Sequence, residues 1–296
     1  MTIREALKEG ARLLETPCPT ALIDTPGLDA ALLLGEVLHL RREELIVRAN
    51  SKVSEKEYED YSHLLSRRMN GECIAYILGR KEFRGLEFTV GPQVLVPRPD
   101  SETLIEAALD YIENEDPFIS CSHKYRCSLL DLCTGSGALA IALKHERPFL
   151  NISASDISPE ALKLAQHNAT RLLGGGHLGN LNFIESDLFE NISGKFNIII
   201  SNPPYVDSLI LPGLAPELHR EPLIALDGGK GGLDLIRKIV TEAPDHLHPE
   251  GVLLLEADPG QMPCIRSLLE KNKFRNIRVR KDLAGRDRVV SARCFV

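Results

Sequence analysis

The residues with the most chemical information are Asn202, Pro203, Pro204 and Tyr205, which come after the apolar run Ile198–Ile200 and Ser201. Such a run predicts a buried strand that delivers Asn202 to the carboxyl edge of a sheet. The Asn202 side-chain oxygen and the Pro203 carbonyl could accept both N–H bonds of a planar amide or amine. The prolines fix φ and add no donors, and Tyr205 could stack on the planar group. The structural alternative is a turn that merely ends the strand.

A second candidate site is a turn that follows a predicted strand at 128–132 and precedes a predicted helix at 137–145. The turn consists of Cys133, Thr134, Gly135, Ser136 and Gly137. Its glycines let the backbone approach a ligand closely, and the start of the helix presents unpaired N–H groups. These features predict a nucleotide-like ligand at the carboxyl end of the strand.

The identity of that ligand stays open at this point, because with Ala140 the turn also satisfies the dinucleotide pattern GxGxxA. Asp156 ends the next predicted strand and could accept hydrogen bonds from both ribose hydroxyls of either adenosine cofactor. It could instead only cap the following helix. Asp187 could accept from an adenine amino group, and Leu188 could cover the ring.

Taken with Asn202 to Tyr205, these residues favour S-adenosylmethionine as the cofactor. The lone pair of a planar NH2 group is delocalised, so this group is a poor nucleophile that must be aligned with a reactive methyl. The sulfonium makes the methyl reactive, and the protein contributes alignment. The absence of an obvious catalytic histidine is therefore compatible with this chemistry.

These side chains need a sheet to position them, and residues 98–296 alternate short apolar runs with helical periodicity. Repeated units of this kind predict an α/β fold with a mainly parallel sheet, closed by an antiparallel edge hairpin. Residues 1–78 have helical spacing and predict a small helical domain for substrate recognition. Residues 79–97 alternate around Gly91 and Pro92, which predicts a connecting β-hairpin turning there.

The composition limits the class of partner. The chain has 296 residues and a formal net charge of -7, which argues against stable binding to a nucleic acid backbone. No apolar run approaches the roughly 18 residues of a membrane span, and no secretory signal is recognisable, so we expect a cytoplasmic protein without membrane contact. Seven scattered cysteines predict neither disulfides nor a metal site. A cluster of Cys121, His123 and Cys127 is the alternative.

Seven segments together resemble the protein-(glutamine-N5) methyltransferases that modify peptide chain release factors. These segments are VLVPRPDSE (94–102), DLCTGSG (131–137), DISPEAL (156–162), SDLF (186–189), NPPY (202–205), EPLIALDGGKGGL (221–233) and GRDRV (285–289). The resemblance implies a Rossmann-like, seven-stranded methyltransferase sheet and S-adenosylmethionine as the cofactor. It also implies methylation of the glutamine side-chain amide in the Gly-Gly-Gln loop of release factors.

The resemblance further implies residue roles. Residues 133–137, Asp156, Leu188 and Asn202 would contact the cofactor, and residues 202–205 would receive the glutamine. Arg98 would line the entrance, or would be a turn residue paired with Glu102.

The chain departs from the family pattern in three places. Cys133 stands where glycine is frequent, Leu188 where an aromatic is frequent, and residues 257–259 read Ala-Asp-Pro in a stretch that is usually more glycine-like.

Three rival functions stay open. A sister enzyme would methylate glutamine in a ribosomal protein. An adenine-specific nucleic acid methyltransferase could use the same Asn-Pro-Pro-Tyr acceptors for a flipped base. An NAD-binding oxidoreductase would leave residues 202–205 without a role.

Overall fold

The computed structural model describes residues 1–15, 23–113, 127–177 and 179–295. Cys121 and His123, considered above for a metal cluster, lie outside these residues. Contacts divide the chain into two compact units. The smaller comprises Met1–Arg80 with Gly213–Glu221, and the larger comprises Lys81–Pro212 with Pro222–Val296. The sequence did not predict that the segment 213–221 would group with the helical unit.

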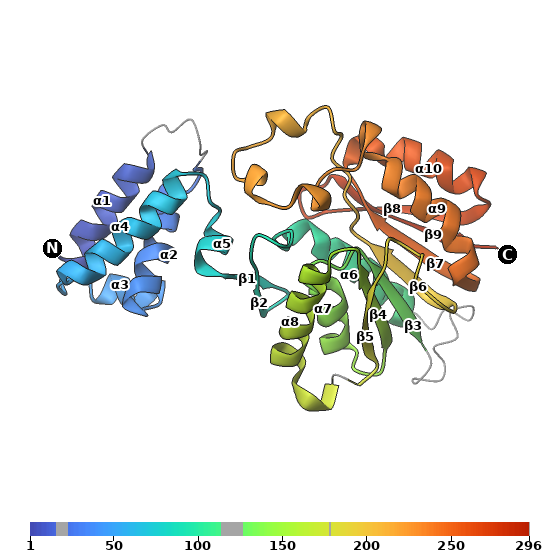
Figure 1. Cartoon of the computed structure of the whole chain (residues 1–296), viewed down its shortest axis with the longest axis horizontal. Coiled ribbons are helices and arrows are strands. Elements are labelled where there is room, and N and C mark those ends of the chain that lie inside the picture. Colours follow the sequence, from blue (N-terminus) through green and yellow to red (C-terminus); the bar gives the residue numbers. More distant parts are fainter. Residues whose placement is uncertain (16–22, 114–126, 178, 296) are drawn as a thin grey trace. The chain divides into compact units, whose positions relative to one another are not determined.

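The smaller unit is built from helices around its own apolar core (Figure 1). Its helices are α1 (Ile3–Glu15), α2 (Pro26–Leu38), α3 (Arg42–Val47), α4 (Glu55–Met69) and α5 (Ile74–Leu78). Helix α4 begins with a capping box, in which the Ser54 Oγ accepts from the Glu57 N–H and the Glu57 carboxylate accepts from the Ser54 N–H. Leu33, Leu34 and Tyr61 are fully buried between the helices.

The segment 213–221 is fixed within this unit by a buried arginine. Arg68 is 5% exposed; its Nε donates to Asp29 Oδ2 at 2.7 Å, and its Nη1 lies 2.6 Å from Glu217 Oε1. Arg220 also donates to the Asn70 carbonyl at 3.1 Å. A buried guanidinium needs such partners, because an unpaired charge in a core is costly.

A short hairpin begins the larger unit, but its turn is not at the predicted position. Strands β1 (Arg80–Phe83) and β2 (Leu86–Thr89) are joined at Arg84 and Gly85, which both have positive φ. Positive φ at both central residues suits a two-residue hairpin turn. The predicted turn at Gly91 and Pro92 is therefore wrong, because the Arg-Gly pair was not recognised as a turn signal.

The larger unit contains a seven-stranded sheet in the order β5-β4-β3-β6-β7-β9-β8. Its strands are β3 (Ser128–Leu132), β4 (Asn151–Asp156), β5 (Leu181–Glu185), β6 (Phe196–Ser201), β7 (Leu247–Glu256), β8 (Phe274–Lys281) and β9 (Asp287–Cys294). Neighbouring strands are parallel from β5 to β7, whereas β9 is antiparallel to both β7 and β8. The Rossmann-like fold class and the closing antiparallel pair predicted from the sequence are confirmed.

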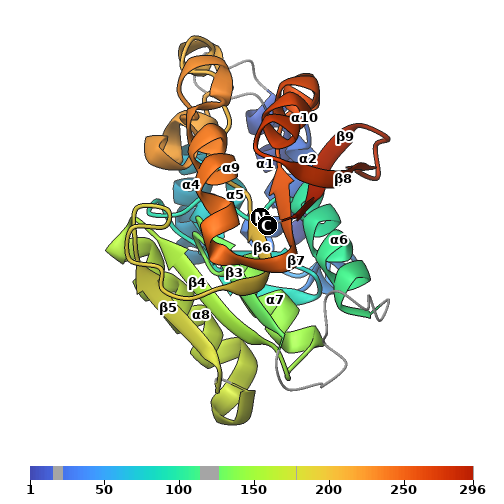
Figure 2. The ribbon, with the colours of Figure 1, turned by 90° about the vertical axis from the view of Figure 1, so that its right-hand side faces the viewer.

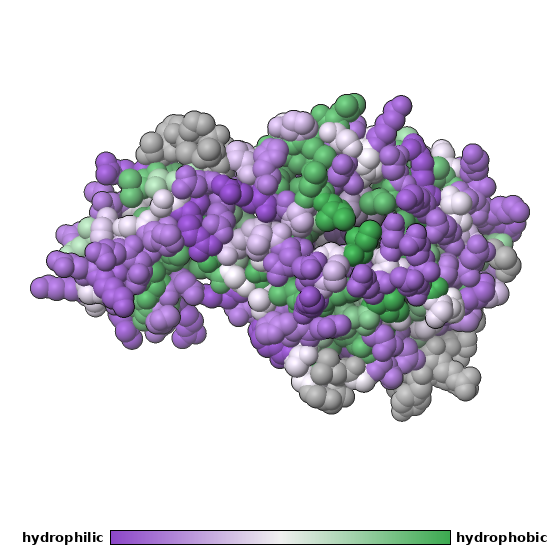
Figure 3. All heavy atoms as spheres, viewed as in Figure 1, coloured by the Kyte–Doolittle hydropathy of each residue, from purple (hydrophilic) through white to green (hydrophobic). Residues whose placement is uncertain are grey.

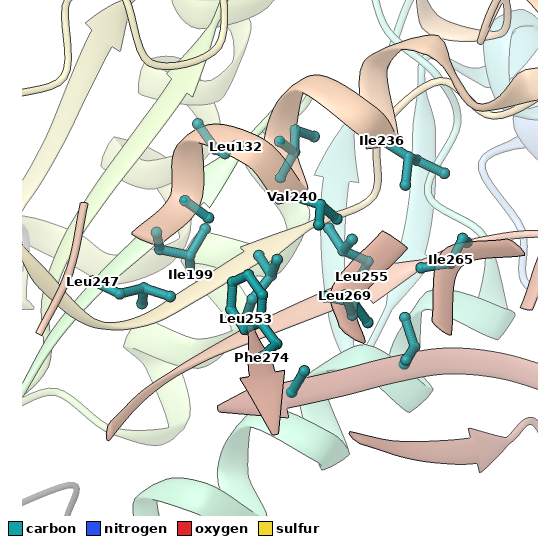
Figure 4. Packing of buried hydrophobic residues seen from close by; sticks show 14 of the residues in the cluster. Leu132, Ile199, Ile236, Val240, Leu247, Leu253, Leu255, Ile265, Leu269 and Phe274 are labelled. Atoms are coloured by element: carbon teal, nitrogen blue, oxygen red, sulfur yellow. The ribbon is translucent and has the colours of Figure 1, made fainter. Parts of the chain in front are cut away.

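Helices cover both faces of this sheet (Figure 2). They are α6 (Glu102–Glu113), α7 (Ala138–Glu146) and α8 (Pro159–His177) on one face, and α9 (Asp234–His246) and α10 (Met262–Lys271) on the other. The α9 and α10 face is packed with Leu, Ile, Val and Phe side chains from strands and helices alike (Figure 4). Burying each such side chain contributes roughly 1.5–3 kcal/mol, so this core fixes the strands rigidly. In the described part of the chain, no helix is both long and apolar enough to cross a bilayer.

Candidate active site

Strand register brings the predicted site residues together. Leu132 of β3 lies opposite Ser155 of β4 and Ser201 of β6, and Ser201 lies opposite Leu255 of β7. The residue after each of these positions therefore reaches the same carboxyl edge of the sheet. Those residues are Cys133, Asp156, Asn202 and Glu256.

A pocket of about 1100 Å³, counting its open mouth, lies at this edge within the larger unit. Its lining includes most of the residues singled out from the sequence. They are Arg98, Cys133, Thr134, Gly135, Ser136, Asp156, Asp187, Leu188, Asn202 and Pro204. Gly137, Pro203 and Tyr205 are not among the lining residues and lie directly beside them in the chain.

The turn after β3 has the geometry that requires glycine. Gly135 has φ +55°, and a Cβ built there would meet nothing within 4 Å, so its exposed face opens onto the pocket. Gly137 has φ +80°, and a Cβ there would lie 2.8 Å from Ile141 Cδ1 of α7 and 3.1 Å from Ala165 Cβ of α8. One glycine thus leaves space for a ligand, and the other allows α7 and α8 to pack closely.

Cys133 also adopts a positive φ, of 60°, in the same turn. This conformation costs an L-residue roughly 1–2 kcal/mol, and glycine adopts it freely. The frequent glycine at this position in the resembling family has a physical explanation in this backbone angle. The Cys133 side chain compensates in part by packing against the core on the α9 and α10 face.

Asp156 stabilises both the glycine turn and the residue that precedes helix α8. Its Oδ2 accepts from the Gly135 N–H at 2.8 Å, and its Oδ1 accepts from the Ser158 N–H at 3.0 Å. The cap of α8 is Ser158, whose Oγ accepts from the Ala161 N–H at 3.2 Å, so capping is not the role of Asp156, and its carboxylate lines the pocket. Burial raises the pKa of this carboxyl, and the backbone hydrogen bonds oppose that shift.

Asp131, beneath the turn, was not assigned a role from the sequence. It is fully buried; its Oδ2 accepts from Thr134 Oγ1 at 2.6 Å and from the Ala140 N–H at 3.2 Å. Its Oδ1 has no hydrogen-bond partner among the described residues. Burial raises the pKa of Asp131 to about 7, and the bonds to Thr134 and Ala140 only partly offset this effect. The side chain holds the turn and the start of α7 together.

The loop after β5 supplies another wall of the pocket. Leu188 has φ 48°, and its carbonyl accepts from Ser186 Oγ at 2.8 Å, which fixes the loop beside Asp187. Leu188 is 7% exposed and lines the pocket. An apolar wall next to a carboxylate suits the face and the amino edge of an adenine ring.

Asn202 lies in the pocket wall, where the sequence argument required it. Its Nδ2 donates to Ser101 Oγ at 3.0 Å. Ser101 ends a short 3-10 turn, η1 (Pro99–Ser101), and is 4% exposed. The carboxamide is therefore anchored through its nitrogen, which leaves its oxygen as the acceptor for a ligand.

The Tyr205 side chain has a contact that was not anticipated. Its ring packs against the core, and its hydroxyl donates to Glu256 Oε1 in a long hydrogen bond of 3.4 Å. Burial raises the pKa of the Tyr205 hydroxyl, and the neighbouring Glu256 adds to this effect. Stacking of the ring on a substrate amide stays a prediction.

The backbone of residues 204–205 is clamped by a glycine-rich turn at 228–232. A Cβ at Gly228 would lie 2.7 Å from both the Pro204 carbonyl oxygen and Tyr205 Cα, and a Cβ at Gly232 would overlap the Tyr205 carbonyl. Gln261 Nε2 donates to that carbonyl at 2.7 Å. These contacts explain why this part of the chain is rich in glycine.

The residues around the glycine turn fit the adenosine part of S-adenosylmethionine. Gly135 leaves open a space that any side chain would fill. The Asp156 carboxylate in the pocket wall could accept hydrogen bonds from the ribose hydroxyls of the cofactor. Asp187 and Leu188 supply a polar edge and an apolar face. The polar side chains and the open space of this part of the pocket are thus both compatible with adenosine.

The fold and this pocket define a methyltransferase built on a Rossmann-like sheet. Family models described as "PrmC N-terminal domain" and "Methyltransferase small domain" match residues 5–79 and 118–212. A methyltransferase structure from Pyrococcus furiosus superposes with a TM-score of 0.51 at 19% identity, covering 79% of this chain and 100% of that one. At that identity the likeness concerns the fold alone.

Curated relatives are much closer in sequence. The release factor glutamine methyltransferase of Moorella thermoacetica is 35% identical over 100% of this chain and 98% of the relative. The Vibrio cholerae enzyme of the same name is 38% identical over 98% of this chain and 96% of the relative. The chain belongs to the release factor glutamine methyltransferase family.

Sequence reasoning assigned no role to Ser101, Asp131, Gln261 and Glu256. Ser101 and Asp131 lie within quoted motif segments, and Glu256 and Gln261 lie within two residues of the Ala-Asp-Pro at 257–259. Motif membership could have drawn attention to them. Their partners, however, depend on which strands are neighbours in the sheet.

Proposed function

We propose that this chain transfers the methyl group of S-adenosylmethionine to the side-chain amide nitrogen, N5, of the glutamine in the Gly-Gly-Gln motif of peptide chain release factors. The observation that carries the proposal is that Asn202 lines the same pocket as the glycine turn and Asp156. An acceptor for an amide and a seat for an adenosine cofactor therefore share one cavity. The sequence similarity to the release factor enzymes supports this substrate.

The residues have distinct roles in this proposal. Residues 133–137 and Asp156 hold the cofactor through backbone N–H groups and the carboxylate, and Asp187 and Leu188 receive the adenine. The Asn202 side-chain oxygen and the Pro203 carbonyl accept the two N–H bonds of the glutamine amide. Pro204 and Tyr205 keep these acceptors rigid, and Arg98 lies at the pocket wall near the entering chain.

When bound, S-adenosylmethionine would supply an electrophilic methyl on a sulfonium, a leaving group able to take the bonding electron pair. With both N–H bonds held by acceptors, the nitrogen lone pair is left to point toward that methyl. The amide nitrogen forms the new bond to carbon and then loses one of its two protons to solvent. The contribution of the protein is orientation, which can be worth several orders of magnitude in rate.

The surface beside the pocket favours a protein substrate. Leu209, Ile210, Leu223 and Ile224 are between 56% and 83% exposed, and Ile224 also lines the pocket. Figure 3 shows hydrophobic surface, in green, at the place where Figure 1 draws the connection after β6. Exposed apolar side chains gathered beside a site are typical of protein contacts and unsuited to a phosphate backbone.

The test uses purified protein with radiolabelled S-adenosylmethionine and, in separate reactions, a release factor, ribosomal proteins and duplex DNA. We expect label in the release factor, at the motif glutamine by mass spectrometry. Replacement of that glutamine in the release factor should abolish labelling. Label that appears only in ribosomal protein or only in DNA would overturn the proposed substrate. A cytoplasmic location remains a prediction from the sequence.

A further inference from the structure

The direction in which the Asn202 carboxamide faces decides whether the pocket accepts or repels an amide. One end of this planar group is an acceptor and the other a double donor, and the two have nearly the same shape. In the structure, Nδ2 donates to Ser101 Oγ at 3.0 Å. A flipped carboxamide would present its NH2 group to the N–H bonds of a substrate, which is repulsive.

Ser101 can fix this direction only if its own proton is engaged elsewhere. A hydroxyl has one proton and two lone pairs, so it can donate to one partner while it accepts from another. Ser101 is 4% exposed, and its hydroxyl is near enough to the Glu256 carboxyl to lower the pKa of that carboxyl. When its proton goes to Glu256, only lone pairs face Asn202, and the carboxamide must offer its NH2.

Glu256 ends strand β7, directly beside the end of β6, and is 1% exposed. Four groups from three parts of the chain influence its charge. They are Ser101 and Asp100 of η1, Tyr205 after β6, and Arg288 of β9. Arg288 is itself engaged by Asp100 at 3.0 Å and by Asp282 at 3.3 Å, so much of its charge is already balanced. Glu256 Oε2 has no hydrogen-bond partner within the described part of the chain.

We infer that Ser101 and Glu256 are positioning residues for the proposed amide methylation, and that the ionised Glu256, acting through the Ser101 hydroxyl, keeps the Asn202 oxygen turned toward the substrate nitrogen. The inference rests on the proposed function. In it Ser101 of η1 and Glu256 of β7 act on the substrate only through Asn202, the residue that follows β6.

Protonation of Glu256 reverses this chain. A neutral carboxyl can donate to Ser101, the hydroxyl then donates to Asn202, and the carboxamide turns its oxygen away from the substrate. Burial raises the pKa of Glu256 to about 7, with Ser101 and Arg288 lowering it and Asp100 raising it. The active orientation is therefore present above this pKa and is lost as the pH falls through it.

The first test measures orientation without turnover. Protein labelled with 15N-asparagine gives a side-chain NH2 signal for Asn202, identified by its loss in Asn202→Ala. We expect that signal to shift with pH, with a midpoint near the pKa of Glu256, and to be independent of pH in Glu256→Gln. A midpoint retained in Glu256→Gln would overturn the inference. This measurement needs neither cofactor nor substrate, so its failure is distinct from failure of the proposed function.

The second test measures catalysis with saturating cofactor and release factor between about pH 5.5 and about pH 9. For the wild type, kcat should fall on the acid side. Glu256→Gln should lose that limb and about 10- to 100-fold in kcat, with the cofactor Kd within about twofold. Ser101→Ala should lose about tenfold in kcat, and Ser101→Thr should recover most of it because the hydroxyl is restored.

Ser291→Ala is the matched control, because Ser291 is 7% exposed and its hydroxyl shares a 3.0 Å hydrogen bond with Tyr111 outside the pocket lining. It should keep wild-type kcat. If Glu256→Gln fails to fold, the comparison of Ser101→Ala with Ser101→Thr tests the positioning role instead. Unchanged kcat in Ser101→Ala, or equal losses in the alanine and threonine variants, would contradict the positioning role.

Discussion

Two buried carboxyl groups lie beneath the two halves of the pocket, and their partners differ in range along the chain. Asp131, under the cofactor half, bonds Thr134 and Ala140, which are 3 and 9 residues away. Glu256, under the acceptor half, bonds Tyr205, which is 51 residues away, and its pKa is lowered by Ser101 on η1. Burial raises the pKa of both to about 7.

The difference teaches how the two halves are made rigid. The cofactor half is a local structure of backbone, in which glycines with positive φ and N–H groups form the surface. The acceptor half is a long-range structure of side chains and clamped carbonyls, which exists only when β6, β7 and η1 are assembled. Changes to the first should act on cofactor affinity, and changes to the second on kcat.

The largest effect among four substitutions is expected at the clamp of the acceptor half. In Gly232→Ala the new Cβ would overlap the Tyr205 carbonyl and displace the backbone that carries Asn202 and Pro203. We expect kcat to fall about 100-fold or more while the cofactor Kd changes little. Gly231→Ala is the control, because Gly231 also has positive φ but a Cβ there would meet nothing within 4 Å. Equal losses in both variants would show that backbone strain, and not the clamp, is responsible.

In the cofactor half, Asp156→Asn should weaken cofactor binding about 10- to 100-fold, measured by calorimetry. The amide has one acceptor oxygen in place of the two that Asp156 offers to the Gly135 and Ser158 N–H groups. It also has no negative charge with which to attract the ribose hydroxyls. With saturating cofactor, kcat should be largely recovered. Asp258→Asn is the control for a purely capping carboxylate, because Asp258 accepts from the Gly260 N–H at 2.8 Å and does not line the pocket. A similar loss of affinity there would contradict a ligand-binding role for Asp156.

The buried carboxyls also predict a pH dependence of stability. A carboxyl whose folded pKa is raised binds more protons in the folded than in the unfolded state, so its stabilisation is present at low pH and is lost as the pH rises. For Asp131 the loss falls between the unfolded pKa, about 4, and the folded pKa of about 7. In the wild type, the free energy of unfolding should therefore fall as the pH rises from about 5 to about 8. Asp131→Asn should make this fall smaller by on the order of a few kcal/mol, as measured by urea unfolding at the two pH values. An unchanged slope in the variant would show that Asp131 is ionised in the folded protein.

The smallest effect is expected for Cys133→Gly. Glycine relieves the positive φ of 60° but gives up the packing of the thiol side chain and adds freedom to the unfolded chain. These terms oppose one another, so the free energy of unfolding should change by less than about 1 kcal/mol. Cofactor affinity should also stay within about threefold, since the backbone N–H groups are kept. A loss of several kcal/mol would mean that the thiol packing dominates.

The same contrast explains what the sequence could predict. The glycine turn, Asp156 and the Asn-Pro-Pro-Tyr segment follow apolar strands directly, so their residue types and neighbours in the chain indicated both a site and its chemistry. The strand predicted at 128–132 and the helix predicted at 137–145 likewise agree with β3 and α7 within one residue. The partnership of Ser101, Asn202 and Glu256 could not be predicted, because it depends on β6 lying next to β7 and on η1 reaching the same edge. The hairpin turn at Arg84 and Gly85 was missed because an arginine with positive φ carries no turn signal.

The central claim is that an amide acceptor and a cofactor seat act together in one pocket but are separable. Asn202→Ala tests it most directly, with cofactor binding and methylation of the release factor glutamine measured on the same preparation. The account predicts a cofactor Kd within about threefold of wild type and a fall in kcat of at least about 1000-fold. Methylation of the glutamine at the wild-type rate by the Asn202→Ala variant would contradict the claim.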